Sequence, residues 1–398
     1  MFVSSFRCSL RPLPSFASAT RPIAAFRSIR AMSTKFTLDT YLVTPAELNS
    51  ALQKNIHSKL STAPRVIPLC AAWFLPNDGR NGYETFLEQR IPHARFFDLD
   101  AVKDPHSPYP HMLPDPKTFA EAMQHMGIRR EDSVVVYDTK ELGIFSAPRV
   151  GWTLRAFGHD NVHVLNNFRK WVEEGYPTES GQGKEPYPTQ YPIPELDQSQ
   201  VVAFEEVKQL AKEVKMEGAD EVQILDARSK GRWQGVDPEP REGLSSGHIP
   251  YSISMPITEL LDPKDKTLLP ASELQAVFKS KGVDPSKPII NSCGTGVTAA
   301  VIDAALTEAG YPTQQRRLYD GSWTEWAQRV NPNEGLIRKV DDSGVNPGSF
   351  PAPLPTPVTV FPSPLVAPAT VPRASPFPIA PVVLLTVPCK PFVAAPAV

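Results

Sequence analysis

The chain has 398 residues, and its 41 Lys and Arg residues against 43 Asp and Glu residues give a net charge of -2. This length suits two domains that each bury a hydrophobic core, and the balanced charge excludes a general attraction to nucleic acid or to an anionic membrane. The four cysteines show no CxxC or His-paired spacing, which argues against a zinc site and against a disulfide framework. A reducing compartment, in which free thiols persist, therefore suits the chain best.

The N-terminal segment differs in composition from the rest of the chain. Residues 1–35 are rich in Arg, Ser and Ala and precede the first acidic residue, Asp39. This composition is typical of a mitochondrial transit peptide. We therefore predict a mitochondrial protein, with a cytoplasmic form if translation starts at Met32; an N-terminus that is merely disordered is the alternative.

The central part of the chain alternates between strand-like and helix-like segments. Short apolar runs predict strands, and the 3.6-residue spacing of apolar positions predicts helices. The predicted strands are residues 66–70, 222–226 and 289–292, and the predicted helices are residues 116–126, 271–281 and 299–309. This alternation predicts an α/β fold with a mainly parallel sheet that is flanked by helices on both faces.

An internal repeat divides this central part into two halves. Residues 90–94 (Arg-Ile-Pro-His-Ala) parallel residues 247–250 (Gly-His-Ile-Pro), and the strand that ends at Asp138 parallels the strand that ends at Cys293. The first half thus carries an aspartate where the second carries a thiol, and its loop lacks the paired glycines. Chemistry that needs a thiol therefore belongs to the second half.

The repeat and the composition give the predicted boundaries. The predicted segments are an inactive domain at 41–178, a Pro- and Gly-rich linker at 179–198, a catalytic domain at 199–335 and a tail at 341–398. The tail consists mainly of Pro, Ala and Val, and prolines at this density prevent both helix and sheet from propagating, so we expect it to be disordered.

Cys293 carries the strongest chemical signal in the chain. It follows an apolar strand, and the loop that contains Gly294 and Gly296 leads into an Ala-rich helix. Loop N–H groups and the positive end of a helix dipole are features that favour a thiolate, which is the nucleophilic form. A buried structural cysteine is the alternative, but the two glycines favour a reactive thiol.

Five motifs in register resemble the tandem rhodanese-domain sulfurtransferases, and among them the 3-mercaptopyruvate branch more than the thiosulfate branch. They are Ser-Ala-Pro-Arg-Val at 146–150, Asp-Ala-Arg with Gly-Arg-Trp at 226–233, Pro-Glu-Pro-Arg at 238–241, Gly-His-Ile-Pro at 247–250, and Cys-Gly-Thr-Gly-Val-Thr-Ala at 293–299. The resemblance covers about residues 41–335 and implies two tandem rhodanese-like domains. It also implies that Cys293 attacks the sulfur of a donor, becomes a persulfide and passes the sulfur to a thiophilic acceptor.

The family pattern assigns further roles around Cys293. The loop residues Gly294, Gly296, Val297 and Thr298 would bind the substrate sulfur through their N–H groups. The guanidinium groups of Arg232 and Arg241 would bind the donor's carboxylate, although both could be surface arginines. Uncharged residues follow the cysteine where rhodaneses carry basic ones, which favours mercaptopyruvate over the dianion thiosulfate.

A proton relay is the remaining implied feature. The family pattern places it at Thr295, His111 and Asp100, with threonine where serine is usual. A relay is chemically reasonable because the pyruvate enolate that leaves must gain a proton near neutral pH. A hydrogen bond at a domain interface is the alternative for His111 and Asp100.

Other function classes fit less well. The phosphatases of a related fold need an arginine six positions after the cysteine, where this chain has Ala299. A non-catalytic binding module remains an alternative, as does thiosulfate sulfurtransferase. For the main hypothesis we expect a small-molecule sulfur donor, thioredoxin or a small thiol as acceptor, no metal or organic cofactor, no nucleic-acid or membrane partner, and a monomer.

Overall fold

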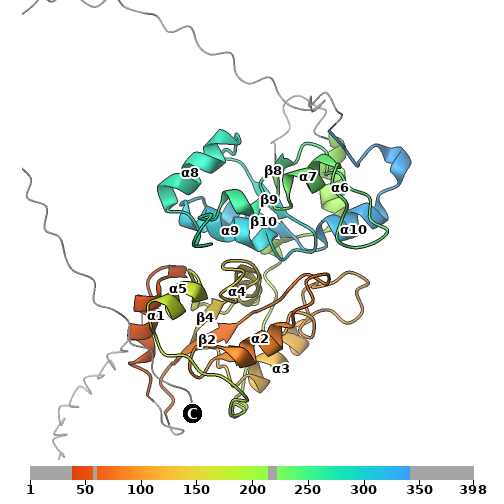
Figure 1. The fold of residues 1–398 in the computed structure, drawn as a ribbon. Helices are drawn as coiled ribbons and strands as arrows, with labels where there is room; N and C mark the ends of the chain where they lie inside the picture. Colours follow the sequence, from red (N-terminus) through yellow and green to blue (C-terminus); the bar gives the residue numbers. More distant parts are fainter. Residues whose placement is uncertain (1–37, 57–60, 214–221, 341–398) are drawn as a thin grey trace, which may run out of the picture. The chain divides into compact units, whose positions relative to one another are not determined.

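The computed structural model of the protein describes residues 38–56, 61–213 and 222–340 (Figure 1). The predicted leader, Met32 and the predicted tail lie outside the described residues. The described part contains two five-stranded sheets, one in each half of the chain.

The two sheets have the same strand order, and all the pairings between their strands are parallel. The first sheet runs in the order β1 (Leu42–Val43), β5 (Val162–Leu165), β4 (Ser133–Tyr137), β2 (Val66–Cys70) and β3 (Arg95–Phe96). The second runs in the order β6 (Val201–Val202), β10 (Arg316–Tyr319), β9 (Ile289–Ser292), β7 (Gln223–Asp226) and β8 (Ile253–Ser254). The α/β fold class and the internal repeat predicted from the sequence are confirmed.

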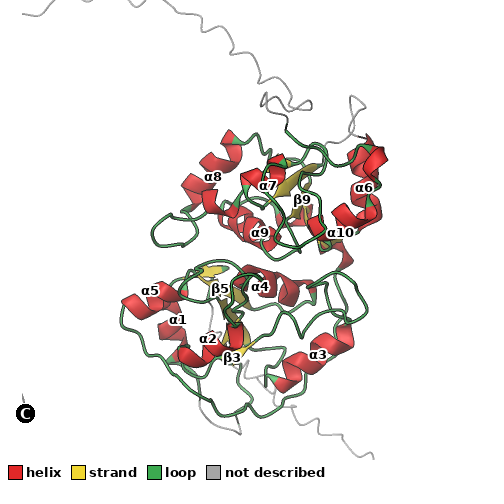
Figure 2. Ribbon diagram, turned by 45° about the vertical axis from the view of Figure 1, so that its right-hand side comes forward, coloured by secondary structure: helices red, strands yellow, loops and turns green. Residues whose placement is uncertain are grey.

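Helices cover both faces of each sheet (Figures 1 and 2). In the first domain, α3 (Pro116–His125) and α4 (Ala147–Ala156) pack on one face, and α1 (Pro45–Leu52), α2 (Gly82–Glu88) and α5 (Phe168–Glu173) pack on the other. In the second domain, α8 (Ala271–Ser280) and α9 (Ala299–Glu308) pack on one face, and α6 (Phe204–Glu213) and α10 (Ser322–Arg329) on the other, while the short α7 (Lys230–Gln234) follows β7. Central strands buried on both faces explain the continuous apolar runs in the sequence.

The predicted helices begin where the sequence indicated, and they end one residue early. α3 ends at His125 because Gly127 adopts φ 65°, and α8 ends at Ser280 because Gly282 adopts φ 75°. A left-handed residue of this kind terminates a helix and is easiest for glycine. The edge strands have only two residues each, too few to produce a periodic pattern, so the sequence did not predict them.

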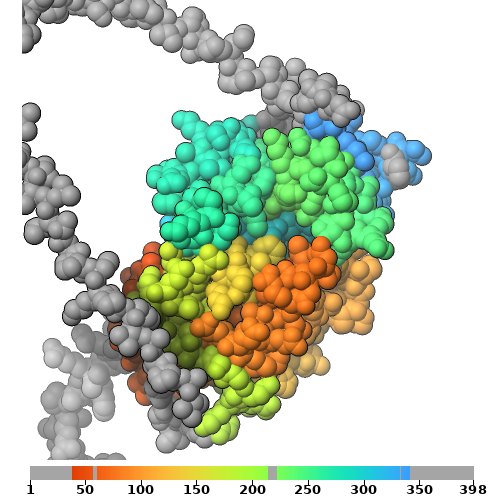
Figure 3. Space-filling model, viewed as in Figure 1, coloured from red at the N-terminus to blue at the C-terminus, as the bar shows by residue number. Residues whose placement is uncertain are grey.

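The two domains share one hydrophobic cluster. It joins α3 and α4 of the first domain to α8 and α9 of the second, and α4 packs directly against α9. Arg155 of α4 makes an ion pair of 2.7 Å with Asp303 of α9, and Arg316 of β10 lies 3.3 Å from the same carboxylate. In the space-filling view the two domains lie directly against each other (Figure 3).

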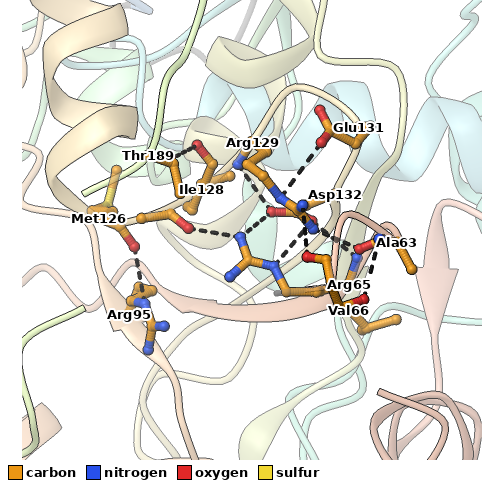
Figure 4. Close-up of polar contacts among 12 residues, drawn as sticks. Ala63, Arg65, Val66, Arg95, Met126, Ile128, Arg129, Glu131, Asp132 and Thr189 are labelled. Carbon is orange, nitrogen blue, oxygen red and sulfur yellow. Dashed lines mark hydrogen bonds and ion pairs between the residues drawn. The ribbon is translucent and has the colours of Figure 1, made fainter. Parts of the chain in front are cut away.

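A polar cluster holds the first sheet at the start of two adjacent strands (Figure 4). The fully buried Asp132 accepts hydrogen bonds from the backbone and side chain of both Arg65 and Arg129. Arg129 in turn donates to the carbonyl of Ala63. A buried carboxylate needs such partners, and this cluster therefore has a structural role in the first sheet, whereas Cys293 follows a strand of the second.

Candidate active site

Cys293 lies immediately after β9, at the floor of a cavity of about 190 Å³. We call this the cysteine cavity; its lining includes Trp73, Phe145, Arg228, Arg232, Arg241 and Cys293. Only 1% of Cys293 is exposed. The carboxyl end of a parallel strand is where α/β sheets bind ligands, and residues of both domains enclose the thiol.

A serine that the sequence did not single out fixes the conformation of the loop after Cys293 through hydrogen bonds. The Ser322 hydroxyl accepts hydrogen bonds from the N–H groups of Cys293 and Gly296, both at 3.1 Å. Gly296 adopts φ 75°, and a Cβ there would lie 2.9 Å from the carbonyl oxygen of Asp320. The loop therefore needs glycine at this position.

The remaining loop N–H groups are available to a ligand. Within the described residues, the N–H groups of Gly294, Thr295, Val297 and Thr298 have no hydrogen-bond acceptor. They precede the N-terminus of α9, where backbone N–H groups and the helix dipole favour an anion. The predicted substrate-binding residue Gly296 differs, because its N–H group is occupied by Ser322; its contribution is the shape of the turn.

Asp138 occupies the corresponding position in the first domain. It follows β4, and its carboxylate accepts hydrogen bonds from the N–H groups of Phe145, Ser146 and Ala147 and from the Ser146 hydroxyl. Burial raises the pKa of Asp138 to about 6, although these hydrogen bonds oppose the shift. The first domain thus retains an anion-binding turn that its own carboxylate fills.

The two predicted donor-binding arginines differ in their pairing. Glu239, buried between two arginines, accepts from Arg228 at 2.8 Å and from Arg232 at 2.5 Å. The Nε and Nη2 atoms of Arg232 are engaged by this carboxylate, so only its outer N–H groups can contact a donor. Arg241 makes no hydrogen bond or ion pair within the described part of the chain. Its guanidinium fork is therefore free.

Thr295, His111 and Asp100 form a continuous hydrogen-bonded chain. His111 Nδ1 lies 3.1 Å from Thr295 Oγ1, and His111 Nε2 lies 3.2 Å from Asp100 Oδ1. Trp73 donates from Nε1 to the other oxygen of Asp100 at 3.0 Å. These hydrogen bonds lead from the buried hydroxyl of Thr295 to the carboxylate of Asp100, whose side chain is 60% exposed. They connect the cysteine cavity to solvent across the domain interface.

Arg149 ties this relay to the loop. Its fully buried guanidinium, on α4, donates to the carbonyl oxygen of His111 at 2.5 Å and makes an ion pair of 2.6 Å with Asp320. It also lies 3.5 Å from the carbonyl oxygen of Gly296. Asp320 accepts from the N–H group of Leu113. One arginine of the first domain thus positions both the relay histidine and the loop of the second domain.

The titration of His111 is a measurable consequence of this environment. Burial lowers the pKa of His111 below 6.5, while the Asp100 hydrogen bond and charge oppose the shift. We expect an NMR titration midpoint for His111 below pH 6.5, so that the ring is neutral at pH 7 and can accept the Thr295 proton. Asp100→Asn should lower the midpoint further, because it removes a group that favours the protonated ring. The His111→Asn spectrum identifies the resonance, and a midpoint above 6.5 would contradict the assignment.

Several residues of the site were absent from the sequence prediction. Ser322, Glu239, Trp73 and Arg149 each contact a predicted residue, and Asp320 pairs with Arg149. Of these, Glu239 and Arg149 lay within motifs that were noted for the resemblance, and a charged residue inside an apolar helix was a usable signal for Arg149.

The described residues contain no group of three or more His, Cys, Asp or Glu side chains arranged to hold a metal ion. Among them there is also no helix of the length and apolarity that crossing a membrane requires.

Comparisons with known proteins agree with this architecture. Residues 206–329 match the family model of the rhodanese-like domain. The chain is 41% identical over 287 residues to the probable 3-mercaptopyruvate sulfurtransferase of Schizosaccharomyces pombe, covering 71% of this chain and 94% of that protein. It is 40% identical over 286 residues to the thiosulfate/3-mercaptopyruvate sulfurtransferase 1, mitochondrial, of Arabidopsis thaliana, covering 68% and 74%.

A third relative also has a solved structure. The chain is 43% identical over 280 residues to thiosulfate sulfurtransferase TUM1 of Saccharomyces cerevisiae, covering 67% of this chain and 90% of that protein. The crystal structure of Tum1 superposes with a TM-score of 0.68 over 75% of this chain and 98% of that chain. Because the likeness covers at least 90% of both yeast relatives and 98% of the Tum1 structure, the chain belongs to the family of sulfurtransferases that are built from tandem rhodanese-like domains.

Proposed function

We propose that the chain is a 3-mercaptopyruvate sulfurtransferase, and the contact between Thr295 and His111 is the observation that carries the proposal. His111 Nδ1 lies 3.1 Å from the hydroxyl of Thr295, two residues after the cysteine, which supports a proton-transfer chain close to the sulfur nucleophile. A carbon leaving group needs a proton, whereas sulfite leaving from thiosulfate does not. The S. pombe relative with the mercaptopyruvate name supports the same assignment.

The reaction follows from these positions. The Cys293 thiolate attacks the donor sulfur, an S–S bond forms, and the donor's C–S bond breaks with its electron pair on carbon. The donor thiol's proton passes to that carbon through Thr295 and His111, which gives pyruvate and an anionic persulfide. The free N–H groups of Gly294, Thr295, Val297 and Thr298 stabilise this anion. An acceptor thiol then removes the outer sulfur and regenerates Cys293.

Substitution of the two cavity arginines tests how the donor is bound. Arg241→Ala should raise the KM for mercaptopyruvate about 10- to 100-fold, because a charge-assisted hydrogen bond contributes about 1.5–3 kcal/mol. We expect a smaller effect of Arg232→Ala on KM, because Glu239 already occupies its fork. The measurement is steady-state kinetics with variable donor, together with the rate of Cys293 alkylation by a neutral reagent, which should not change. Equal KM values for wild type and Arg241→Ala would remove Arg241 from the donor site.

Thiosulfate sulfurtransferase is the second candidate. The observation in its favour is that Arg232 and Arg241 line the same small cavity, together with Arg228, and such a concentration of guanidinium groups suits a dianion. The name of the S. cerevisiae relative supports it as well. The kcat/KM values for the two donors decide between the candidates, and a clear preference for thiosulfate would overturn our choice. If neither donor transfers sulfur to Cys293, the chain is a binding module.

The cellular context is part of the proposal. The Arg-rich leader supports a mitochondrial location, as does the name of the A. thaliana relative. A start at Met32 would give a cytoplasmic form, and comparing the N-termini of the protein from the two compartments tests this. The transferred sulfur is itself the carried group, so the proposal needs no cofactor, and one chain contains the whole site, consistent with a monomer.

A further inference from the structure

A second cavity adjoins the cysteine cavity and shares Arg241 with it. Its volume is about 510 Å³. We call it the outer groove; its lining includes Lys103, Tyr109, Arg241, Glu242, Leu244 and Gln328. The first domain supplies the loop that contains Lys103 and Tyr109, and the second domain supplies the loop after Arg241 and part of α10. The groove therefore lies over the same domain interface as the relay.

The sizes of the two cavities indicate that they hold different molecules. The cysteine cavity has about 190 Å³, less than the roughly 300–1,000 Å³ of typical small-molecule sites, and it suits a donor of a few heavy atoms. The outer groove falls within that range. Because Cys293 is only 1% exposed, an acceptor larger than the donor must leave most of its atoms outside the cysteine cavity while its thiol enters.

The charges of the outer groove are unpaired. Neither Lys103 nor Arg241 makes an ion pair or hydrogen bond with any described residue, and neither does Glu242. By contrast, Arg149 and Arg228, which contact the same loops, are paired with Asp320 and Asp226. Two free cations and one free carboxylate at one groove complement a ligand that carries carboxylates and an ammonium group.

We propose that the outer groove binds the sulfur acceptor, and that this acceptor is a small peptide thiol with carboxylates and an ammonium group. The inference rests on the proposed function, because it needs a persulfide on Cys293. The carboxylates of the acceptor contact Lys103 and Arg241, and the ammonium group of the acceptor contacts Glu242. Its thiolate attacks the outer persulfide sulfur and forms a new S–S bond. The bond to Cys293 breaks, the Cys293 thiolate leaves, and the acceptor's own thiol proton ends on the transferred sulfur.

The test compares a charged acceptor with a neutral one. The enzyme is first loaded with sulfur and freed of donor, and mass spectrometry then follows the loss of persulfide with glutathione or with 2-mercaptoethanol. Lys103→Glu should raise the glutathione concentration needed for half-maximal rate about tenfold or more and leave the 2-mercaptoethanol reaction unchanged. Lys117→Glu, on the exposed surface of α3, is the matched charge control and should change neither.

The other outcomes of this experiment overturn either the proposed acceptor site or the proposed function. An unchanged glutathione response in Lys103→Glu would overturn the proposal, and so would an equal loss with both thiols. An effect of Lys103 on unloading by reduced thioredoxin alone would also overturn it, in favour of a protein acceptor. Failure of Cys293 to take up sulfur from any donor would instead overturn the proposed function, and this loading step is measured before an acceptor is added.

Discussion

Replacing Cys293 with serine is expected to abolish sulfur transfer, with a fall in kcat/KM of at least about 10³-fold for every donor. A hydroxyl cannot hold the transferred sulfur as a persulfide, and the free loop N–H groups cannot compensate for a missing nucleophile. Pyruvate release measures the loss of turnover. The mass of the intact protein after exposure to donor shows whether the variant holds a transferred sulfur atom. Uptake of one sulfur atom by the serine variant would contradict the assignment of Cys293.

Cys70 offers a matched control within the same chain. It too is a buried free cysteine at the end of a strand, in the first domain. Burial raises the pKa of its thiol to about 12, so it remains a neutral thiol at pH 7. Cys70→Ser should therefore retain sulfur uptake by Cys293.

The second large effect is expected at Arg149. Arg149→Met should lower the free energy of unfolding by about 3–5 kcal/mol, because it leaves the buried Asp320 without its counter-charge. Urea unfolding at pH 7 measures the change. The double variant Arg149→Met/Asp320→Asn should recover part of the loss, since the uncompensated charge is then gone.

An exposed ion pair calibrates that measurement. Lys117 lies 3.8 Å from Glu121 on α3, and both side chains are largely exposed. Lys117→Met should change the free energy of unfolding by less than about 1 kcal/mol. If Arg149→Met were equally mild, the pair with Asp320 would not stabilise the contact between relay and loop.

The fold could be predicted because its signals are local. Apolar runs such as residues 66–70 record burial on both faces of a sheet, and a left-handed glycine such as Gly127 records a helix end. The repeat then identified Asp138 as the counterpart of Cys293, and the structure places both at the same turn of equivalent sheets. Each of these features depends on residues that are close in sequence.

The details of the site depend on contacts between distant residues, which periodicity does not record. The sequence named Arg232 and Arg241 together, but only the structure shows that Glu239 engages the first and leaves the second free. The roles of Thr295 and His111 came from the family pattern, and their separation of 3.1 Å across the domain interface depends on how the two sheets pack. Ser322 had no signal in the sequence, because it accepts hydrogen bonds from the N–H groups of a loop that lies 26 to 29 residues earlier in the chain.

The hydrophobic cluster shared by α4 and α9 has a consequence for how the molecule denatures. Separating the domains would expose apolar surface on both helices together with the Arg155–Asp303 pair, so each domain should be less stable alone than in the intact chain. The second domain alone should unfold at a lower temperature than the full chain, and it should lack sulfur transfer because His111, Asp100 and part of the cavity lining belong to the first domain. The domain without a nucleophile thus has a thermodynamic role as well, because the contact between α4 and α9 should stabilise the catalytic domain against unfolding.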